Sequence, residues 1–148
     1  MSRLRAVALA LVVGATVVVG GYGVDAARAG ASDGPALGPG LVTVHVDIRY
    51  SRFRLDHLRV RAGTLVRFVI RNRDPINHEL VVGPASVHAA HRHGTERTHP
   101  PVPGEVSVAA DGTGETVYRF TRPGRVVYAC HLPGHFAYGM VGEITVLR

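Results

Sequence analysis

The sequence predicts an all-β domain, a β-sandwich of about seven to eight strands. The apolar residues of the domain are rich in Val and fall into short alternating runs, and 18 Gly and 9 Pro separate those runs. No segment after residue 40 shows convincing helical periodicity. The 148 residues suit one domain plus a tail, which is enough chain to bury one core without disulfides.

The N-terminus has the features of an export signal. Two arginines in the first five residues precede an uncharged, largely apolar run at residues 6–24, and Ala27 and Ala29 fit a cleavage site after Ala29. The run is also long enough to span a bilayer, so residues 1–29 are expected to be a signal peptide or an N-terminal membrane anchor. Either alternative predicts an extracytoplasmic domain, which is periplasmic, on the cell surface or secreted, because the positive charge before the run stays inside.

A short spacer is expected after this signal. Residues 30–40 read GASDGPALGPG, a composition with almost nothing to pack into a core. We therefore predict a flexible linker at 30–40 and a folded domain at 41–148.

The strands are expected in order along the domain. Val44, Val46 and Ile48 alternate with polar residues in the first run, and the third run alternates in the same way. The second run is weaker, and residues 84–104 are expected to be a long loop rich in His and Pro, with at most a turn of helix around 86–92. The predicted strands are 41–50, 53–60, 64–71, 78–82, 106–108, 115–120, 125–130 and 141–147.

The charge balance argues against several functions. The formal net charge is +6 and the sequence pI is about 10.4, which suits nucleic acid, an anionic membrane or an acidic protein as partner. The arginines are scattered over alternating strand positions with no dense run and no interleaved aromatic residues, so we predict no nucleic-acid binding. The sequence also lacks a nucleophile–base arrangement and a phosphate-binding Gly loop, so we predict neither enzymatic activity nor a small-molecule substrate.

Three metal-ligand side chains lie close together near the C-terminus. Cys130, the single cysteine of the chain, is followed by His135 and Met140, with four residues in each interval and a Pro/Gly-containing loop between them. A loop of this kind can bring a thiolate, an imidazole and a thioether to one point. Two His, one Cys and a weak axial Met form a blue-copper electron-transfer site. The second imidazole is expected from His78, which begins a strand after a tight turn.

The chain resembles the cupredoxins, which are small blue-copper proteins. Residues 128–146 match their motif Cys-x₄-His-x₄-Met followed by a final strand, and residues 58–72 with Asp74 and His78 match the region of their first histidine. The resemblance covers residues 41–148 and implies a Greek-key β-sandwich that holds one type 1 copper ion. It also implies the role of each ligand. His78 and His135 would be equatorial ligands through an imidazole nitrogen, Cys130 would be the thiolate, and Met140 would be the axial thioether.

The resemblance further implies an electron carrier that docks on partner proteins. The edge of His135 would be the electron gateway, and Phe136 and Tyr138 either join a docking patch around it or pack in the core. In many relatives a polar residue beside the first histidine ties the two ligand loops together, and here Asn77 and Glu79 both remain candidates. The basic charge favours redox partners with an acidic docking surface.

Other histidines leave further possibilities open. The loop holds a His-x-His pair, and its four histidines either bind a second metal ion or are simply solvated; they are His88, His91, His93 and His99. His131 is left out of the copper site, because on an extended backbone it points away from its neighbour Cys130.

Two functions therefore compete for the same copper ion. The first is electron transfer between redox partners, and the alternative is copper storage, delivery or resistance. An enzyme such as a copper oxidase would need a second copper centre, and one domain with one ligand set argues against it.

Overall fold

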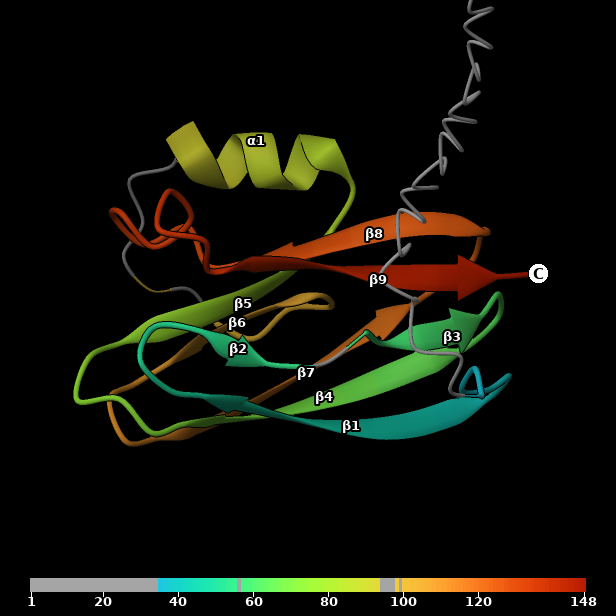
Figure 1. The fold of residues 1–148 in the computed structure, drawn as a ribbon, viewed down its shortest axis with the longest axis horizontal. Helices are drawn as coiled ribbons and strands as arrows, with labels where there is room; N and C mark the ends of the chain where they lie inside the picture. The colour runs from blue at the N-terminus through green and yellow to red at the C-terminus, as the bar shows by residue number, and fades with distance from the viewer. Residues whose placement is uncertain (1–34, 56, 94–97, 99) are drawn as a thin grey trace, which may run out of the picture. The chain divides into compact units, whose positions relative to one another are not determined.

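The domain is a β-sandwich of two sheets, shown as a ribbon in Figure 1. The computed structural model describes residues 35–148 except 56, 94–97 and 99. The sheets have the strand orders β2-β1-β4-β7 and β3-β9-β8-β5-β6, which confirms the predicted fold class. The strands are β1 Leu41–Ile48, β2 Phe53–Arg54, β3 Arg59–Arg61, β4 Leu65–Asn72, β5 His78–Gly83, β6 Glu105–Val108, β7 Thr113–Arg119, β8 Gly124–Ala129 and β9 Val141–Leu147, with one helix, α1 Ala85–His93.

The four-stranded sheet has the predicted alternation. β1 and β4 run parallel in register along their whole length, and β7 pairs antiparallel with β4. From Val44 on in β1 and from Val66 on in β4, every second residue is buried against the opposite sheet, and these residues include Phe68 and Ile70. Since successive side chains of a strand point to opposite faces, the inward set forms the core and the outward arginines remain in water.

The run at residues 53–60 is two strands rather than one. β2 pairs with β1 in the four-stranded sheet, whereas β3 pairs in parallel with β9 in the other sheet. The chain crosses between the sheets here, so the prediction of one continuous strand is wrong. A hydrophobic run in the sequence indicates that its residues are buried. It does not indicate which sheet each half of the run joins through backbone hydrogen bonds.

The predicted long loop contains a helix that follows β5 directly. α1 runs from Ala85 to His93 and packs on β5, above the five-stranded sheet in Figure 1. The Pro84 carbonyl accepts the first helical hydrogen bonds, from the backbone N–H groups of Val87 and His88. Gly83 permits the tight connection, since a Cβ there would meet the Val87 side chain at 3.2 Å. All six residues of β5 are buried, which is explained by core on one face and α1 on the other.

Part of the predicted linker is packed. The Leu37 N–H donates to the Arg59 carbonyl and the Arg61 N–H donates to the Leu37 carbonyl, both at 2.9 Å. Leu37 thereby bridges to Val60 and packs against the core, so the expectation of an unpacked linker is wrong at this residue. The sequence of this segment, which is rich in Gly and Pro, does not indicate the backbone pairing of Leu37 with Val60.

The predicted signal peptide or anchor at residues 1–29 lies outside the described residues, as do residues 30–34. Within the described part of the chain, no helix is long and apolar enough to cross a membrane.

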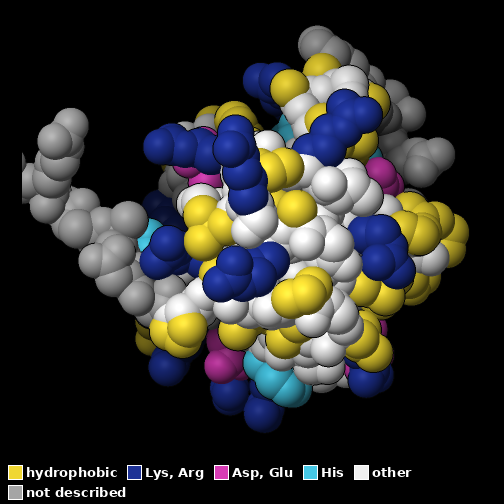
Figure 2. Space-filling model, turned by 90° about the vertical axis from the view of Figure 1, so that its right-hand side faces the viewer, with side chains coloured by type: hydrophobic (Ala, Val, Ile, Leu, Met, Phe, Trp, Pro, Cys, Tyr) yellow, Lys and Arg dark blue, Asp and Glu magenta, His cyan; other side chains and the backbone are white. Residues whose placement is uncertain are grey.

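The basic side chains are dispersed over the surface. Figure 2 shows the end of the sandwich where the chain terminates, and its Arg side chains are spread among hydrophobic and neutral groups. Several of the basic groups pair with acidic side chains across strands, as in Arg67–Glu115, Arg73–Asp47 and Arg125–Glu143. No dense basic patch is seen on the face in Figure 2.

Candidate metal centre

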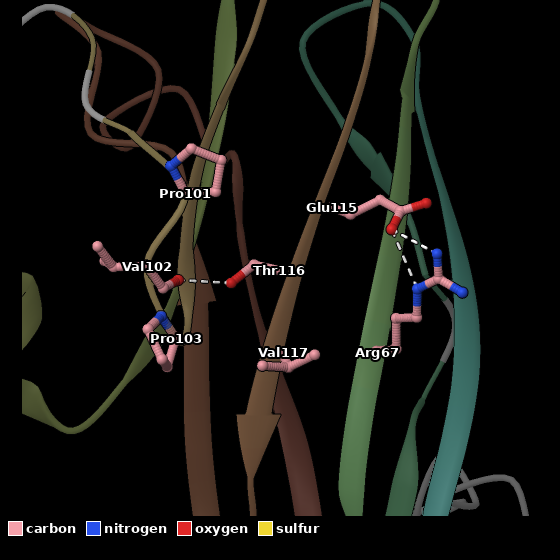
Figure 3. A pocket seen from close by; sticks show the side chains of 7 residues that line it. All are labelled: Arg67, Pro101, Val102, Pro103, Glu115, Thr116 and Val117. Carbon is pink, nitrogen blue, oxygen red and sulfur yellow. Dashed lines mark hydrogen bonds and ion pairs between the residues drawn. The ribbon is translucent and has the colours of Figure 1, made fainter.

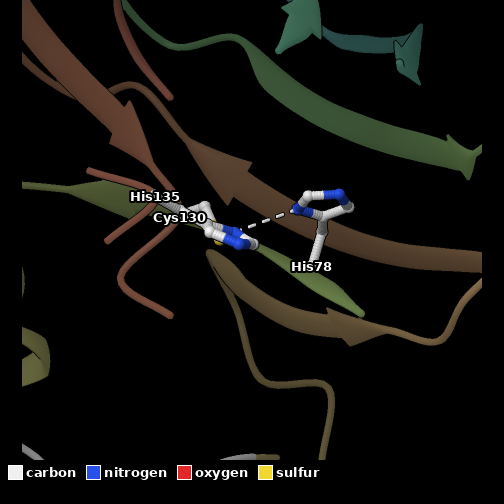
Figure 4. A group of neighbouring side chains, drawn as sticks. All are labelled: His78, Cys130 and His135. Carbon is white, nitrogen blue, oxygen red and sulfur yellow. Dashed lines mark hydrogen bonds between the residues drawn. The ribbon is translucent and has the colours of Figure 1, made fainter. Parts of the chain in front are cut away.

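Three predicted ligands meet at the end of the sandwich where β5 begins and the β8–β9 loop lies (Figures 1 and 4). Nδ1 of His78 is 3.2 Å from Nδ1 of His135, and that same His135 nitrogen is 3.2 Å from Sγ of Cys130. One donor atom from each residue lies within 4.8 Å of the other two. The predicted thiolate–imidazole set is therefore assembled by the fold, from segments 57 residues apart in sequence for the two histidines.

His78 is held in place by a carboxylate on its far side. It is buried as the first residue of β5, and its Nε2 is 3.0 Å from the Asp74 carboxylate. Asp74 in turn accepts the backbone N–H groups of Tyr50 and Ser51, each at 2.7 Å. Because Nε2–H can donate to this carboxylate, the Nδ1 lone pair faces the donor set, as in most histidines that bind metals.

Burial keeps His78 in the form that binds metal. Desolvation lowers the pKa of His78, and the hydrogen bond to Asp74 opposes that change without reversing it. A neutral imidazole is the form that coordinates. The pKa of Asp74 is lowered, because hydrogen bonds from Ser51, Tyr50 and His78 outweigh its desolvation.

Cys130 and His135 are set by the fold of the β8–β9 loop. The His135 N–H donates to the Leu132 carbonyl at 3.0 Å, and the Met140 N–H donates to the His135 carbonyl at 2.9 Å. Gly134 adopts φ +85°, a conformation that side chains disfavour, and it turns the chain back toward Cys130. Burial raises the pKa of the Cys130 thiol to about 11, so metal binding has to release that proton.

Met140 lies in the core at the end of the same loop. Its side chain is fully buried, and its carbonyl accepts the Cys130 N–H at 3.1 Å. This bond places the backbone of Met140 next to Cys130. Its axial ligand role stays a prediction.

Glu79, not Asn77, ties the two ligand segments together. Oε1 of the buried Glu79 accepts the backbone N–H of His131 at 2.6 Å, directly beside Cys130. Oδ1 of the exposed Asn77 instead accepts the Ala110 N–H at 3.0 Å, in the turn before β7. The sequence left both open because each residue adjoins His78, and strand alternation alone does not show which carboxylate or amide reaches the other loop.

The contact of Asp74 with His78 was not predicted from the sequence. Asp74 was visible only as part of a motif four residues before His78. Its role depends on the β1–β2 turn, whose residues Tyr50 and Ser51 have positive φ and direct their N–H groups at the carboxylate. Ser51 is 23 residues from Asp74 in the sequence, so the residues around Asp74 do not indicate this contact.

The aromatic residues near the loop differ in exposure. Tyr138 is 76% exposed, whereas Phe136 is half-buried and stacks on His131 with ring centroids 5.2 Å apart. Tyr128 is buried, and its hydroxyl donates to the Leu55 carbonyl at 3.1 Å. Tyr138 therefore lies on the surface, and Tyr128 packs in the core.

The four histidines of the predicted loop divide between α1 and positions that the structure does not describe. His88 and His91 lie on α1, and the His131 ring contacts both rather than the donor set around Cys130. The side chain of His93 and the whole of His99 lie outside what the structure describes.

The pocket in Figure 3 lies away from these donors. It has a volume of about 290 Å³ beside β4 and β7. Arg67 and Glu115 pair with each other there, and the Thr116 hydroxyl donates to the Val102 carbonyl at 2.6 Å. The residues that line it include no His or Cys.

The donor chemistry suits copper. A thiolate and two imidazoles are soft to borderline ligands, and a set of this kind is typical of a type 1 site. The three donors already lie within 4.8 Å of one another, so one ion can contact all of them.

Comparisons with known proteins agree with copper binding. The chain is 42% identical over 99 residues to the copper-resistant cuproprotein CopI of Rubrivivax gelatinosus, over 64% of this chain and 59% of that relative's length. It is 28% identical over 127 residues to the CopI of Pseudomonas aeruginosa, over 64% of this chain and 70% of the relative. The solved structure of auracyanin B matches with a TM-score of 0.60 and 25% identity, covering 77% of this chain and 94% of that one.

The family model described as copper binding proteins, plastocyanin/azurin family, matches residues 41–147, nearly the whole domain. This match, the sandwich fold and the His–Cys–His cluster agree with one another. The chain therefore belongs to the plastocyanin/azurin family of copper-binding proteins, the cupredoxins.

Proposed function

We propose that this protein works outside the cytoplasm as a mononuclear type 1 copper protein that carries electrons between redox partners. The observation that carries the proposal is the convergence of His78, Cys130 and His135 on one point of a rigid sandwich. Copper bound there supplies a one-electron couple between Cu(I) and Cu(II).

The framework around the donors supports electron transfer. His78 is restrained by Asp74, and the Cys130 segment is restrained by Glu79 through the neighbouring N–H. Restraints on both ligand segments limit movement of the donors between oxidation states. A small reorganisation favours fast electron exchange.

The exposure of the ligands supports a route through His135. His78, Cys130 and Met140 are buried, whereas His135 is half-buried. Exposed apolar side chains lie on the same ligand-bearing segments, and they are Ile76 (47%), Tyr138 (76%) and Val141 (40%). A partner protein that covers such groups would approach the imidazole edge, and the net charge of +6 favours a partner with an acidic surface.

Copper resistance is the second candidate function. Both CopI relatives carry the name copper-resistant cuproprotein, and one of them is 42% identical to this chain. The chain spans 59% of the length of that relative, so the activity of the whole relative is carried over here only as a proposal. In this role the same donors capture copper for storage, delivery or detoxification.

A visible spectrum tests the copper centre. The full-length protein with one equivalent of Cu(II) should turn intensely blue or green, bleach with ascorbate and recover on oxidation. Cys130→Ser should lose the colour, because it arises from thiolate-to-copper charge transfer, while the exposed His45→Ala control keeps it. A pale wild-type protein would contradict a type 1 centre.

Copper release separates the two functions. An electron carrier should exchange electrons with a redox protein many times before copper passes to a competing chelator. A copper-handling protein should release copper to the chelator readily, and its gene should restore growth on copper in a deletion strain only when Cys130 is intact.

A further inference from the structure

A second pair of histidines faces each other beside the copper centre. His88 comes from α1, and His131 follows Cys130 in the β8–β9 loop. Nδ1 of His88 is 2.9 Å from Nε2 of His131, and the two rings are tilted by 52°. The copper centre shows a similar feature, since Nδ1 of His78 lies 3.2 Å from Nδ1 of His135.

The hydrogen-bond partners direct a lone pair of His88 toward His131. Nε2 of His88 is 3.2 Å from the Val127 carbonyl, which can only accept, so this nitrogen carries the hydrogen. Nδ1 of His88 is then the bare nitrogen that faces His131. A backbone carbonyl behind one ring nitrogen is the usual support of a histidine that binds a metal through the other.

His131 is incompletely satisfied whichever ring nitrogen is protonated. Its Nδ1 is buried and has no hydrogen-bond partner among the described residues. If His131 carries its hydrogen on Nε2, its Nδ1 is a buried acceptor without a donor. If it carries the hydrogen on Nδ1, the lone pair of its Nε2 faces the lone pair of His88 Nδ1 at 2.9 Å. In the second form, a cation between His88 and His131 satisfies both facing nitrogens.

A third imidazole and two carboxylates lie next to this pair. His91 is one turn beyond His88 on α1, and its ring centroid is 5.8 Å from that of His131. Nδ1 of His91 is 2.9 Å from the Val87 carbonyl, and its Nε2 is 3.3 Å from a carboxylate oxygen of Glu105.

The charges near the pair are mixed. Glu79 contributes the second carboxylate, through its bond to the His131 N–H. Arg92 is the opposing positive charge, and its guanidinium lies over the Phe136 ring, 5.5 Å from the centroid. Glu79 and Glu105 therefore offset the positive charge of Arg92 near a bound cation.

We propose that His88 and His131 form a second metal site for a divalent ion that prefers imidazole, Cu(II) or Zn(II). Two imidazole nitrogens about 2.0–2.1 Å from one ion lie about 2.9 Å apart at the right angle of square-planar Cu(II), and about 3.3–3.4 Å apart at tetrahedral Zn(II). The separation of 2.9 Å found here fits the Cu(II) geometry. The site uses none of the ligands of the first centre, so it stands whether or not the first centre carries electrons.

Calorimetry on the full-length protein tests the second site. The protein is first loaded with one equivalent of copper, and Zn(II) is then titrated into it. We expect one further equivalent to bind, and His88→Gln and His131→Gln to weaken that step by about tenfold or more. The exposed His45→Ala and His57→Ala are matched controls and should bind like wild type.

Two readouts keep the result independent of folding. The intense colour of the first centre reports that each variant is intact, and His88→Gln, which changes a residue outside the β8–β9 loop, carries the test alone if His131→Gln loses colour. With Cu(II) as second ion, an ordinary Cu(II) paramagnetic resonance signal with nitrogen splitting should add to the type 1 signal. Competition between Cu(II) and Zn(II) then identifies the preferred ion.

Three results would overturn the proposal. The first is that no second equivalent of either metal binds below millimolar concentration. The second is that His88→Gln and His131→Gln bind the second ion as tightly as wild type. The third is that binding is lost in His93→Ala or His99→Ala while His88→Gln retains it, which would place the ion elsewhere in the histidine-rich segment.

Discussion

At the residue scale, the copper donors depend on two carboxylates that do not touch the metal position. Asp74 fixes the ring of His78 from behind, and Glu79 fixes the backbone beside Cys130. Both carboxylates are buried, and both accept N–H groups from other segments of the chain. Charged acceptors with several donors are strong restraints, so the two residues set the donor positions before metal binds.

Asp74→Asn should weaken copper binding. The amide keeps the size of the side chain, but it loses the charge and one of the two oxygens that accept the Tyr50 and Ser51 N–H groups. Loss of such an outer partner lowers metal affinity by about 10- to 100-fold. Competition with a copper chelator measures the change, with the half-exposed Asp47→Asn as control. Equal affinities in the two variants would argue against the role of Asp74.

Met140→Leu should keep copper and raise its reduction potential. Leu fills the same buried volume but removes the thioether, and a weak axial ligand tunes the potential of a type 1 centre. Voltammetry together with the visible spectrum measures both properties. Complete loss of copper in this variant would show that Met140 is more than a weak axial ligand.

At the element scale, alternating strands and the helix contribute differently. β1 and β4 present one apolar face to the core and one polar face to water, whereas β5 is buried on both faces. α1 is the element that covers the outer face of β5, and it also carries His88 and His91 toward the β8–β9 loop. The strands therefore build the core, and the helix adds a second set of polar side chains near the copper centre.

Truncation of two neighbouring residues of β4 should change the free energy of unfolding by very different amounts. Phe68 is fully buried and Arg67 is exposed, although they are adjacent in the strand. Phe68→Ala should lower the free energy of unfolding by about 3–5 kcal/mol, because it leaves a cavity in the core. Arg67→Ala removes only an exposed pair with Glu115 and should change it by about 1 kcal/mol or less. Denaturant unfolding measures both, and similar losses would contradict the assigned strand faces.

At the scale of the whole molecule, the centre joins distant parts of the chain. His78 begins β5, while Cys130 and His135 lie beyond β8, and β5 and β8 are neighbours in one sheet. The sheet order therefore brings the ligands together. Metal binding and folding of the sandwich are coupled, because the unfolded chain lacks this site.

Copper should accordingly stabilise the folded domain. A ligand present at 100 times its Kd and bound only by the folded state adds about 2.7 kcal/mol. Thermal unfolding with and without copper should show a higher Tm for the loaded wild-type protein, and Cys130→Ser should lose most of the increase. An equal increase in Cys130→Ser would mean that copper stabilises the protein from another site.

The sequence alone determined much of the fold and the nature of the donor set. Period-two alternation in β1 and β4 marks one buried face, and the spacing of Cys130, His135 and Met140 places three soft ligands in one short loop. These features are local, because strand periodicity and ligand spacing are set within about ten residues.

Only the tertiary structure decided the contacts between distant segments. It separated β2 from β3, placed Leu37 against Val60, and brought His88 onto His131. It also chose Glu79 as the tie between the ligand segments and Asp74 as the support of His78. Each of these contacts depends on which strands pair and which turn lies over which loop, and that information is held by packing across the whole domain rather than by the pattern of any one segment.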